Sequence, residues 1–239
     1  MRLLDLTLPT PAENIALDEA LLDAAEAGEL ADDLLRLWES PQPIVVIGRS
    51  SRVAAEVNES ACRLRGIPIL RRASGGSAIV AGPGCLMYAV VLRYAGREHL
   101  RMLNEAHRHV LTLVADALRP IAAGITQMGT SDLAVNGQKV SGNSLRCKRD
   151  HLLYHGTLLF DFDLDLISRL LQMPPRQPEY RGHRPHAAFV ANLRTRGDML
   201  KQAVVIAFDA RQAVMEWPKA RTHKLVTERY SQAQWNDQR

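Results

Sequence analysis

The sequence predicts an α+β fold: a mixed, largely antiparallel sheet flanked by helices. Three observations carry this prediction. Short apolar runs typical of strands are interleaved with stretches of helical periodicity, and an Asn-Gly pair joins two of the strand-like runs as a hairpin. The composition, 46% hydrophobic and 23% charged over 239 residues, is that of an ordinary globular protein without internal repeats. We therefore expect one domain over residues 1–239.

The first half of the chain predicts two long helices and four strands. Residues 14–27 place Ile15, Leu17, Leu21 and Leu22 near helical spacing, with Asn14 as the expected N-cap. Strands are expected over residues 34–38, 44–48, 68–70 and 86–94, and a short helix over 58–64. The second long helix is expected over 99–118, with one face formed by Leu100, Leu103, Val110, Val114 and Leu118.

The second half continues the alternation. Asn136-Gly137 suits a type I′ turn between strands at 133–135 and 139–142. A further strand is expected over 152–160 and a helix over 164–171. A loop rich in Pro and Arg, residues 174–186, then leads to a final helix over 199–216.

Charge and cysteine usage exclude several classes of protein. The net charge is +4, and the longest basic cluster is interrupted by Cys147, so no dedicated nucleic-acid surface is predicted. Cys62, Cys85 and Cys147 are odd in number and widely spaced, which fits neither a disulfide framework nor a zinc site. Asp5 and Glu13 interrupt any signal-peptide pattern, and no apolar run approaches the ~18 residues of a membrane span. We expect a cytoplasmic protein with no membrane partner.

The first segment whose residues can bind a ligand is Arg71-Arg72-Ala73-Ser74-Gly75-Gly76-Ser77, directly after a predicted strand. Paired glycines allow close approach of the backbone to a ligand, and their N–H groups together with Arg can hold an anion. A Ser-Gly-Gly turn alone is more often only a turn. The segment matches neither of the glycine-rich signatures of nucleotide-binding loops, GxxxxGK[ST] and GxGxxG.

The second segment combines residues 129–133 (GTSDL) with residues 139–144 (KVSGNS). Lys139 lies beside Ser141 and Gly142, which leave room for a ligand, and Asp132 can hold a cation or a ligand amine. A hairpin with a solvated lysine is the plainer interpretation. The scarcity of lysine, 5 residues against 25 arginines, argues against it here.

The third segment is Tyr154-His155-Gly156-Thr157 inside a predicted strand. A histidine beside a glycine in a strand indicates a close approach, either by a ligand or by a backbone group within the core. The remaining histidines show no metal-ligand spacing with cysteines or carboxylates.

Taken in order, these segments resemble one family, the lipoate–protein ligase A family, within a group that includes biotin protein ligases and lipoyl or octanoyl transferases. The resemblance rests on Ile47-Gly48-Arg49, RRASGG (71–76), GTSDL (129–133), KVSGNS (139–144) and YHGT (154–157). Residues 14–19 resemble the family's amino-terminal helix, and RYSQAQWN (229–236) resembles the segment that closes its catalytic domain. The resemblance thus covers nearly the whole chain.

The resemblance implies an enzyme that activates lipoate or octanoate with MgATP and transfers the acyl group to a lysine of a lipoyl domain. ATP with Mg²⁺ is then a co-substrate, lipoate a substrate, and no tightly bound cofactor is expected. The implied partners are the lipoyl domains of 2-oxoacid dehydrogenase complexes or the H protein of glycine cleavage. No carboxy-terminal accessory domain is recognised, so a separate accessory subunit is a further expected partner.

The resemblance also implies roles for single residues. Lys139 would contact the α-phosphate and the acyl carbonyl oxygen, Asp132 would lie near the adenylate and the Mg²⁺ ion, and His155 would line the acyl pocket. The same motifs place further residues around the adenylate: Arg72, Ser74, Gly75, Gly76, Ser77, Ser141, Gly142, Gly156 and Thr157.

The sequence departs from the family pattern at a few positions, which leaves two alternatives open. Ser77 stands where a third glycine is common, and Ala81 where a histidine is common. One alternative is an ATP-independent octanoyl or lipoyl transferase that uses a cysteine thioester, for which Cys147 between Arg146 and Lys148 is the candidate nucleophile. The other is a non-catalytic protein that binds lipoyl-adenylate.

Overall fold

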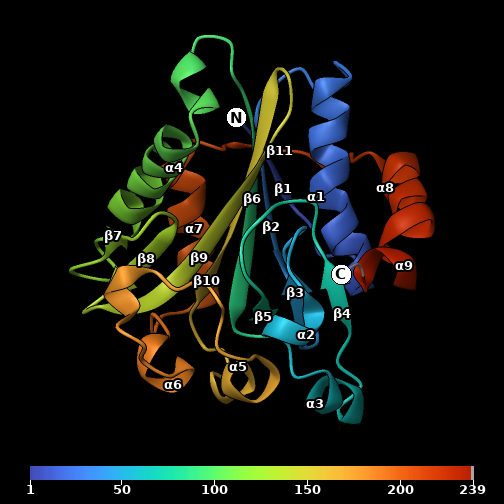
Figure 1. Ribbon diagram of the computed structural model, residues 1–239. Helices are drawn as coiled ribbons and strands as arrows, with labels where there is room; N and C mark the ends of the chain where they lie inside the picture. The colour runs from blue at the N-terminus through green and yellow to red at the C-terminus, as the bar shows by residue number, and fades with distance from the viewer. Residues whose placement is uncertain (238–239) are drawn as a thin grey trace.

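The computed structural model describes residues 1–237 and confirms the predicted fold class (Figure 1). Its centre is an eight-stranded sheet in the order β11-β1-β2-β6-β10-β9-β8-β7. β1 runs parallel to β2 and to β11, and every other pair in this sheet is antiparallel. Its strands are β1 (Arg2–Asp5), β2 (Leu34–Glu39), β6 (Cys85–Arg93), β7 (Thr126–Met128), β8 (Asp132–Val135), β9 (Gln138–Cys147), β10 (His151–Leu159) and β11 (Gln212–Ala213).

A second, three-stranded sheet lies beside the first and has the order β4-β3-β5. Its strands are β3 (Ile44–Ile47), β4 (Ile69–Arg71) and β5 (Ile79–Ala81). All four residues of β3 are buried, because this central strand is covered on both faces. β4 and β5 are joined by residues 72–78, which include Gly75 and Gly76 and are called the glycine loop below. This sheet therefore holds both ends of the loop.

Helices cover the large sheet on both faces (Figure 1). α4 (Leu103–Leu118) and α7 (Gly197–Ala207) pack together on one face, where the largest apolar cluster gathers residues of both helices with Leu35, Tyr88 and Leu152 of the sheet. α1 (Pro11–Glu26) lies on the other face against β6 and β10, with α8 (Lys219–Leu225) outside it. Within residues 1–237, no helix is both long and apolar enough to cross a bilayer.

Short elements complete the chain. They are α2 (Val53–Glu56), α3 (Glu59–Leu64), α5 (Asp165–Leu170), α6 (His186–Phe189), α9 (Ala233–Asn236), the 3₁₀ turns η1 (Glu98–Arg101) and η2 (Glu179–Arg181), and the π-helical turn η3 (Val226–Tyr230). The predicted Pro- and Arg-rich loop therefore contains η2 and ends at the start of α6.

The start of α1 differs from the prediction. The helix begins at Pro11, and Thr10 is its N-cap in a capping box with Glu13. Asn14 lies inside the helix, and its side-chain amide bonds both the N–H and the carbonyl of Leu8. The predicted cap residue thus fastens the chain that precedes the helix.

Two other helix predictions were too long. The expected helix over 99–118 is broken at Met102 into η1 and α4, so Leu103 is 56% exposed and does not share the buried face. The expected helix over 199–216 ends at Ala207, because Asp209 adopts a left-handed backbone with φ of 46°. The chain then adds β11 at the sheet edge before reaching α8.

The segment that resembles the closing part of a catalytic domain packs on β4. The buried guanidinium of Arg71 donates to the carbonyls of Trp235 and Asn236 at 3.0 and 3.1 Å, and to those of Gly48 and Ser51 at 2.9 and 2.7 Å. The Asn236 side chain accepts from the Arg71 N–H at 3.0 Å. Contacts about 165 positions apart in the sequence therefore fix the strand that leads into the glycine loop.

Candidate active site

A cavity of about 400 Å³ opens between the two sheets and brings the three predicted segments together. Its wall is contributed by the glycine loop, by β8 to β10, by α1 and by the loop that follows α5. The predicted site residues that line it are Arg72, Gly76, Ser77, Asp132, Lys139, Gly142, His155, Gly156 and Thr157. A smaller cavity of about 130 Å³ is lined by some of the same residues and by Ser141.

Lys139 is one of the basic residues that line the larger cavity, together with Arg72 and Arg176. Its ammonium pairs with Asp132 Oδ1 at 2.7 Å, and the hydroxyl of Tyr180 donates to Asp132 Oδ2 at 2.8 Å. A Cβ on Gly142 would lie 2.8 Å from both Lys139 Cε and Nζ, so only glycine lets the lysine lie across β9. The ammonium therefore lines both cavities from a defined position.

Arg72 organises the glycine loop from inside. Its side chain is buried and donates to the carbonyls of Val46, Gly75 and Ser77 and to the hydroxyl of Ser74, at 2.5 to 3.2 Å. Burial lowers the pKa of this guanidinium to about 10, so the group still carries its charge at neutral pH. Its donors hold the loop in shape, and the adenylate contact predicted for it stays a prediction.

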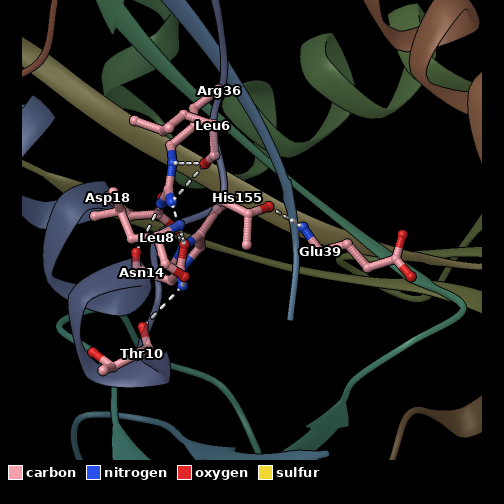
Figure 2. Close-up of polar contacts among 9 residues, drawn as sticks. Leu6, Leu8, Thr10, Asn14, Asp18, Arg36, Glu39 and His155 are labelled. Carbon is pink, nitrogen blue, oxygen red and sulfur yellow. Dashed lines mark hydrogen bonds and ion pairs between the residues drawn. The ribbon is translucent and has the colours of Figure 1, made fainter. Parts of the chain in front are cut away.

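His155 connects that loop to α1. Its Nε2 lies 2.6 Å from Ser74 Oγ, and its Nδ1 lies 3.5 Å from Asp18 Oδ2. Figure 2 shows Asp18 in turn beside the guanidinium of Arg36, whose Nη1 lies 2.6 Å from Asp18 Oδ1. Both partners of that ion pair are buried. Burial lowers the pKa of Arg36 and the Asp18 charge opposes that shift.

The Arg36 guanidinium also anchors the amino-terminal segment (Figure 2). It donates to the carbonyl of Leu6 at 3.1 Å and to the Asn14 side-chain oxygen at 2.6 Å. Since every buried donor has an acceptor, the network is satisfied and rigid. The imidazole that lines the cavity is thus held by α1, β2 and the chain before α1.

Asn143 lines the same cavity as His155. Its Oδ1 accepts from the Tyr88 hydroxyl at 2.5 Å, and its Nδ2 donates to the Ser131 carbonyl at 2.8 Å. A Cβ on Gly156 would overlap the Asn143 carbonyl group, which explains glycine at this point of β10. The amide thereby links β6 and β9 to the turn that precedes Asp132.

The cysteines lie apart from this site. Cys147 is exposed at the far end of β9, eight residues from Lys139, which corresponds to about 26 Å along a strand, and it lines neither of the two cavities. Cys62 and Cys85 are buried, and burial raises the pKa of the Cys85 thiol to about 12. The structure does not bring the predicted alternative nucleophile to the cavity.

A metal centre formed by the protein alone is not found in the described part of the chain. No group of three or more His, Cys, Asp or Glu residues there is arranged to hold an ion. Both oxygens of Asp132 are engaged, by Lys139 and by Tyr180. The predicted contact of Asp132 with Mg²⁺ stays a prediction.

Sequence reasoning missed several residues of the cavity. Asn143 stood within the quoted KVSGNS motif, so its signal was present but not used. Asp18 stood in the segment resembling the family's amino-terminal helix, where a carboxylate inside an apolar pattern was the available signal. Arg176 and Gln177 of the cavity, and Tyr180 beside Asp132, lie in the Pro- and Arg-rich loop, and no pattern there indicated a site.

Comparisons with known proteins identify the family of this chain. The family model described as the lipoyl protein ligase A/B catalytic domain matches residues 10–209, which includes every residue of the cavity. The chain belongs to this family. Family membership confirms the resemblance inferred from the five motifs.

Relatives support the same assignment. A protein of Aeropyrum pernix named for lipoate–protein ligase A is 34% identical over 163 residues, 68% of this chain and 58% of its own length. A Mycoplasma pneumoniae protein named for the same ligase is 32% identical over 163 residues, 68% of this chain and 46% of its own length. The chain thus spans about half the length of the curated ligase relatives it matches.

Two further likenesses concern the whole chain. The octanoyltransferase LipM of Geobacillus kaustophilus is 24% identical and is matched over 100% of this chain and 98% of its own length. A solved structure of a bi-partite lipoate protein ligase from Thermoplasma acidophilum superimposes with a TM-score of 0.84 at 23% identity, covering 99% of this chain and 95% of that one. At this identity the superposition shows the shared fold.

Proposed function

We propose that this family member is a lipoate–protein ligase that activates lipoate or octanoate with ATP and transfers the acyl group to a lysine of a lipoyl domain. The observation that carries the proposal is the position of Lys139, whose ammonium lies over Gly142 at the junction of the two cavities. An acyl-adenylate consists of an acyl chain and an adenosine that are joined through a phosphate. Lys139 and Arg176 line both cavities, so cationic side chains are present where the two cavities meet, which suits that shape.

The proposed chemistry is electrostatic. In the first half-reaction the acyl carboxylate attacks the α-phosphate and pyrophosphate leaves, so charge accumulates on phosphate oxygens. In the second the lysine amine of the lipoyl domain attacks the acyl carbonyl and loses a proton while AMP leaves, so charge accumulates on the carbonyl oxygen. A preorganised ammonium in a water-poor cavity stabilises such charge far better than water does. Lys139 is placed to do this, and Gly76 and Ser77 of the loop line the same cavity.

Mg²⁺ enters this proposal with ATP, as a co-substrate. The ion is usually bound through one or two carboxylates and the substrate phosphates, and retains several waters. Asp18 and Asp132 are the carboxylates among the residues that line the larger cavity, and Asp132 is the predicted contact for the ion. A lipoyl domain is the proposed protein partner, and a separate accessory subunit stays a prediction.

The similarity to LipM favours one alternative, transfer of octanoyl groups without ATP. That reaction needs a reactive thiolate within reach of the acyl chain. In the described chain Cys147 lies at the far end of β9, and burial raises the pKa of Cys85, so neither thiol is suited to that role. The geometry therefore favours the adenylate-forming reaction.

The test is the intact mass of an apo lipoyl domain after incubation with the protein. One reaction contains lipoate and MgATP, and the other contains octanoyl carrier protein without ATP. Modification in the first alone supports the ligase, and modification in the second alone overturns it in favour of the transferase. If neither reacts, synthetic lipoyl-adenylate is supplied, and transfer from it shows that only activation is missing.

Variants sharpen the result. Lys139→Ala is expected to lower activation by at least about 100-fold, since one lost electrostatic donor has an effect of that order. Lys148→Ala is the matched control. Lys148 forms a comparable ion pair, with 2.6 Å between its Nζ and Asp23 Oδ1, and neither residue lines the cavity. Cys147→Ser should leave a ligase unchanged.

A further inference from the structure

Asp132 is a buried carboxylate that receives two donors from different parts of the chain. Lys139 Nζ lies 2.7 Å from Oδ1, and the Tyr180 hydroxyl lies 2.8 Å from Oδ2. Only 6% of the residue is exposed, so water contributes little to holding the carboxylate in place. The orientation of the oxygen that faces Lys139 therefore depends on the bond at the other oxygen.

Tyr180 reaches Asp132 from the loop between α5 and α6. Arg176, Gln177 and Pro178 of this loop line the larger cavity. The tyrosine ring packs on Phe189 with its centroid 5.2 Å away, and after α6 the Ala191 N–H donates to the Lys139 carbonyl at 2.9 Å. The segment that walls the cavity thus also delivers a hydroxyl to Asp132.

The chemistry of the pair gives this bond one direction. Burial, and then the charge of Asp132, raise the pKa of Tyr180, so the phenol stays protonated and donates. Lysine carries its ammonium on a flexible four-carbon stem and has no preferred direction of its own. It needs an acceptor that is itself fixed.

We propose that Tyr180 is a positioning residue, whose hydroxyl orients Asp132 so that the carboxylate holds the Lys139 ammonium over Gly142 at the junction of the cavities. The inference rests on the proposed function, because it assigns a role within adenylate formation. It also couples the geometry of Lys139 to the docking of the 174–186 loop.

Tyr180→Phe tests this directly, because it removes one oxygen atom and leaves the ring on Phe189. We expect kcat for lipoate-dependent ATP–pyrophosphate exchange to fall about 10- to 100-fold, with KM for ATP changed by no more than about twofold. Tyr94→Phe is the matched control, since its ring lies under Arg101 and lines neither cavity. A rise in KM alone would show that Tyr180 only docks the loop, and would overturn the proposal.

A double-mutant cycle separates positioning from packing. If Tyr180 acts through Asp132, adding Tyr180→Phe to Asp132→Asn should lower kcat by no more than about twofold. A purely structural role for the tyrosine predicts the same loss in both backgrounds. Additive losses would therefore contradict the inference.

The second readout does not depend on activity. Amine labelling of the unliganded protein, followed by peptide mass spectrometry, reports how firmly each ammonium is held. In Tyr180→Phe we expect Lys139 to be labelled about threefold or more faster, while Lys148, paired with Asp23, keeps its rate and serves as the folding reference. Unchanged labelling of Lys139 together with unchanged kcat would overturn the proposal.

The two proposals fail in distinguishable ways. If the wild-type protein modifies no lipoyl domain under any condition, the proposed function is wrong, while faster labelling of Lys139 in Tyr180→Phe still supports the positioning role. If the wild type is an active ligase and Tyr180→Phe matches it in both readouts, only the positioning role is wrong.

Discussion

Single residues in this site are constrained by what lies next to them. Gly142 and Gly156 both lie where a Cβ would collide, but the colliding groups differ. At Gly142 the neighbour is the end of the flexible Lys139 side chain, whereas at Gly156 it is the Asn143 amide, which Tyr88 and Ser131 hold in place. The same substitution should therefore have different effects at the two positions.

Gly142→Ala should separate activity from stability. The new methyl group moves the Lys139 ammonium, so acyl-adenylate formation is expected to fall by about 100-fold, as a 1 Å misplacement can do. The free energy of unfolding, measured in urea, should change by less than about 1 kcal/mol, because the lysine side chain can turn aside.

Gly156→Ala provides the contrast. It should destabilise the protein by about 1–3 kcal/mol, the usual cost of overpacking, and combining it with Asn143→Ala should recover part of that loss. Equal stability of the two glycine variants would contradict this account of both positions.

At the scale of elements, α1 and β2 are joined behind the cavity by the buried pair of Asp18 and Arg36. The guanidinium also holds the chain before α1 through Leu6 and Asn14. One charged pair thus fixes a helix, a strand and the amino-terminal segment, and leaves the second oxygen of Asp18 for His155.

Asp18→Ala is expected to lower the free energy of unfolding by about 3–5 kcal/mol, since it leaves a buried arginine without its counter-charge. Urea denaturation followed by circular dichroism measures this. Asp5→Ala is the control, because its ion pair with Lys201 is exposed, and its effect should lie within experimental error. A small effect of Asp18→Ala would mean that carbonyl groups alone satisfy Arg36.

The elements also show which features the sequence can predict. The hairpin at Asn136-Gly137 follows from two residues, and both adopt left-handed backbones with φ of 51° and 73°. Asp209 ends α7 by the same backbone geometry, but aspartate is a weaker signal than glycine, so the predicted helix ran on to residue 216. β5 was not predicted, because it has only three residues, too few to show an alternating pattern.

The site divides in the same way. Lys139, Asp132 and His155 were predicted because each lies in one of the short motifs by which the sequence resembles the family. Asp18 and Arg36 are 18 positions apart on different elements, and Tyr180 is 48 positions from Asp132. Such pairings depend on tertiary packing, which local patterns in one sequence do not encode.

For the whole molecule, one buried histidine and two partly buried ones make stability depend on pH. Burial lowers the pKa of His107, which lies 3.0 Å from the Tyr154 hydroxyl, and likewise the pKa values of His109 and His186. Near and below pH ~6.5 the unfolded chain binds protons that the folded chain does not. The stabilisation is therefore present above that pH and is lost as the pH falls toward the folded-state values.

We expect the free energy of unfolding to decrease between about pH 7.5 and about pH 5.5, measured by urea titration at each pH. His107→Gln, which keeps a polar partner for Tyr154 but does not titrate, should make this decrease shallower. An equally steep slope in the variant would exclude His107 as a contributor.

The carbonyl groups that surround the Arg71 guanidinium have a consequence for protein synthesis. The ribosome completes the glycine loop once residue 78 is made, but the guanidinium beneath it is closed by Trp235 and Asn236. Throughout most of translation the nascent chain therefore carries Arg71 without the carbonyl acceptors of Trp235 and Asn236. These contacts beneath the strand that leads into the loop can form only after residue 236 has been made.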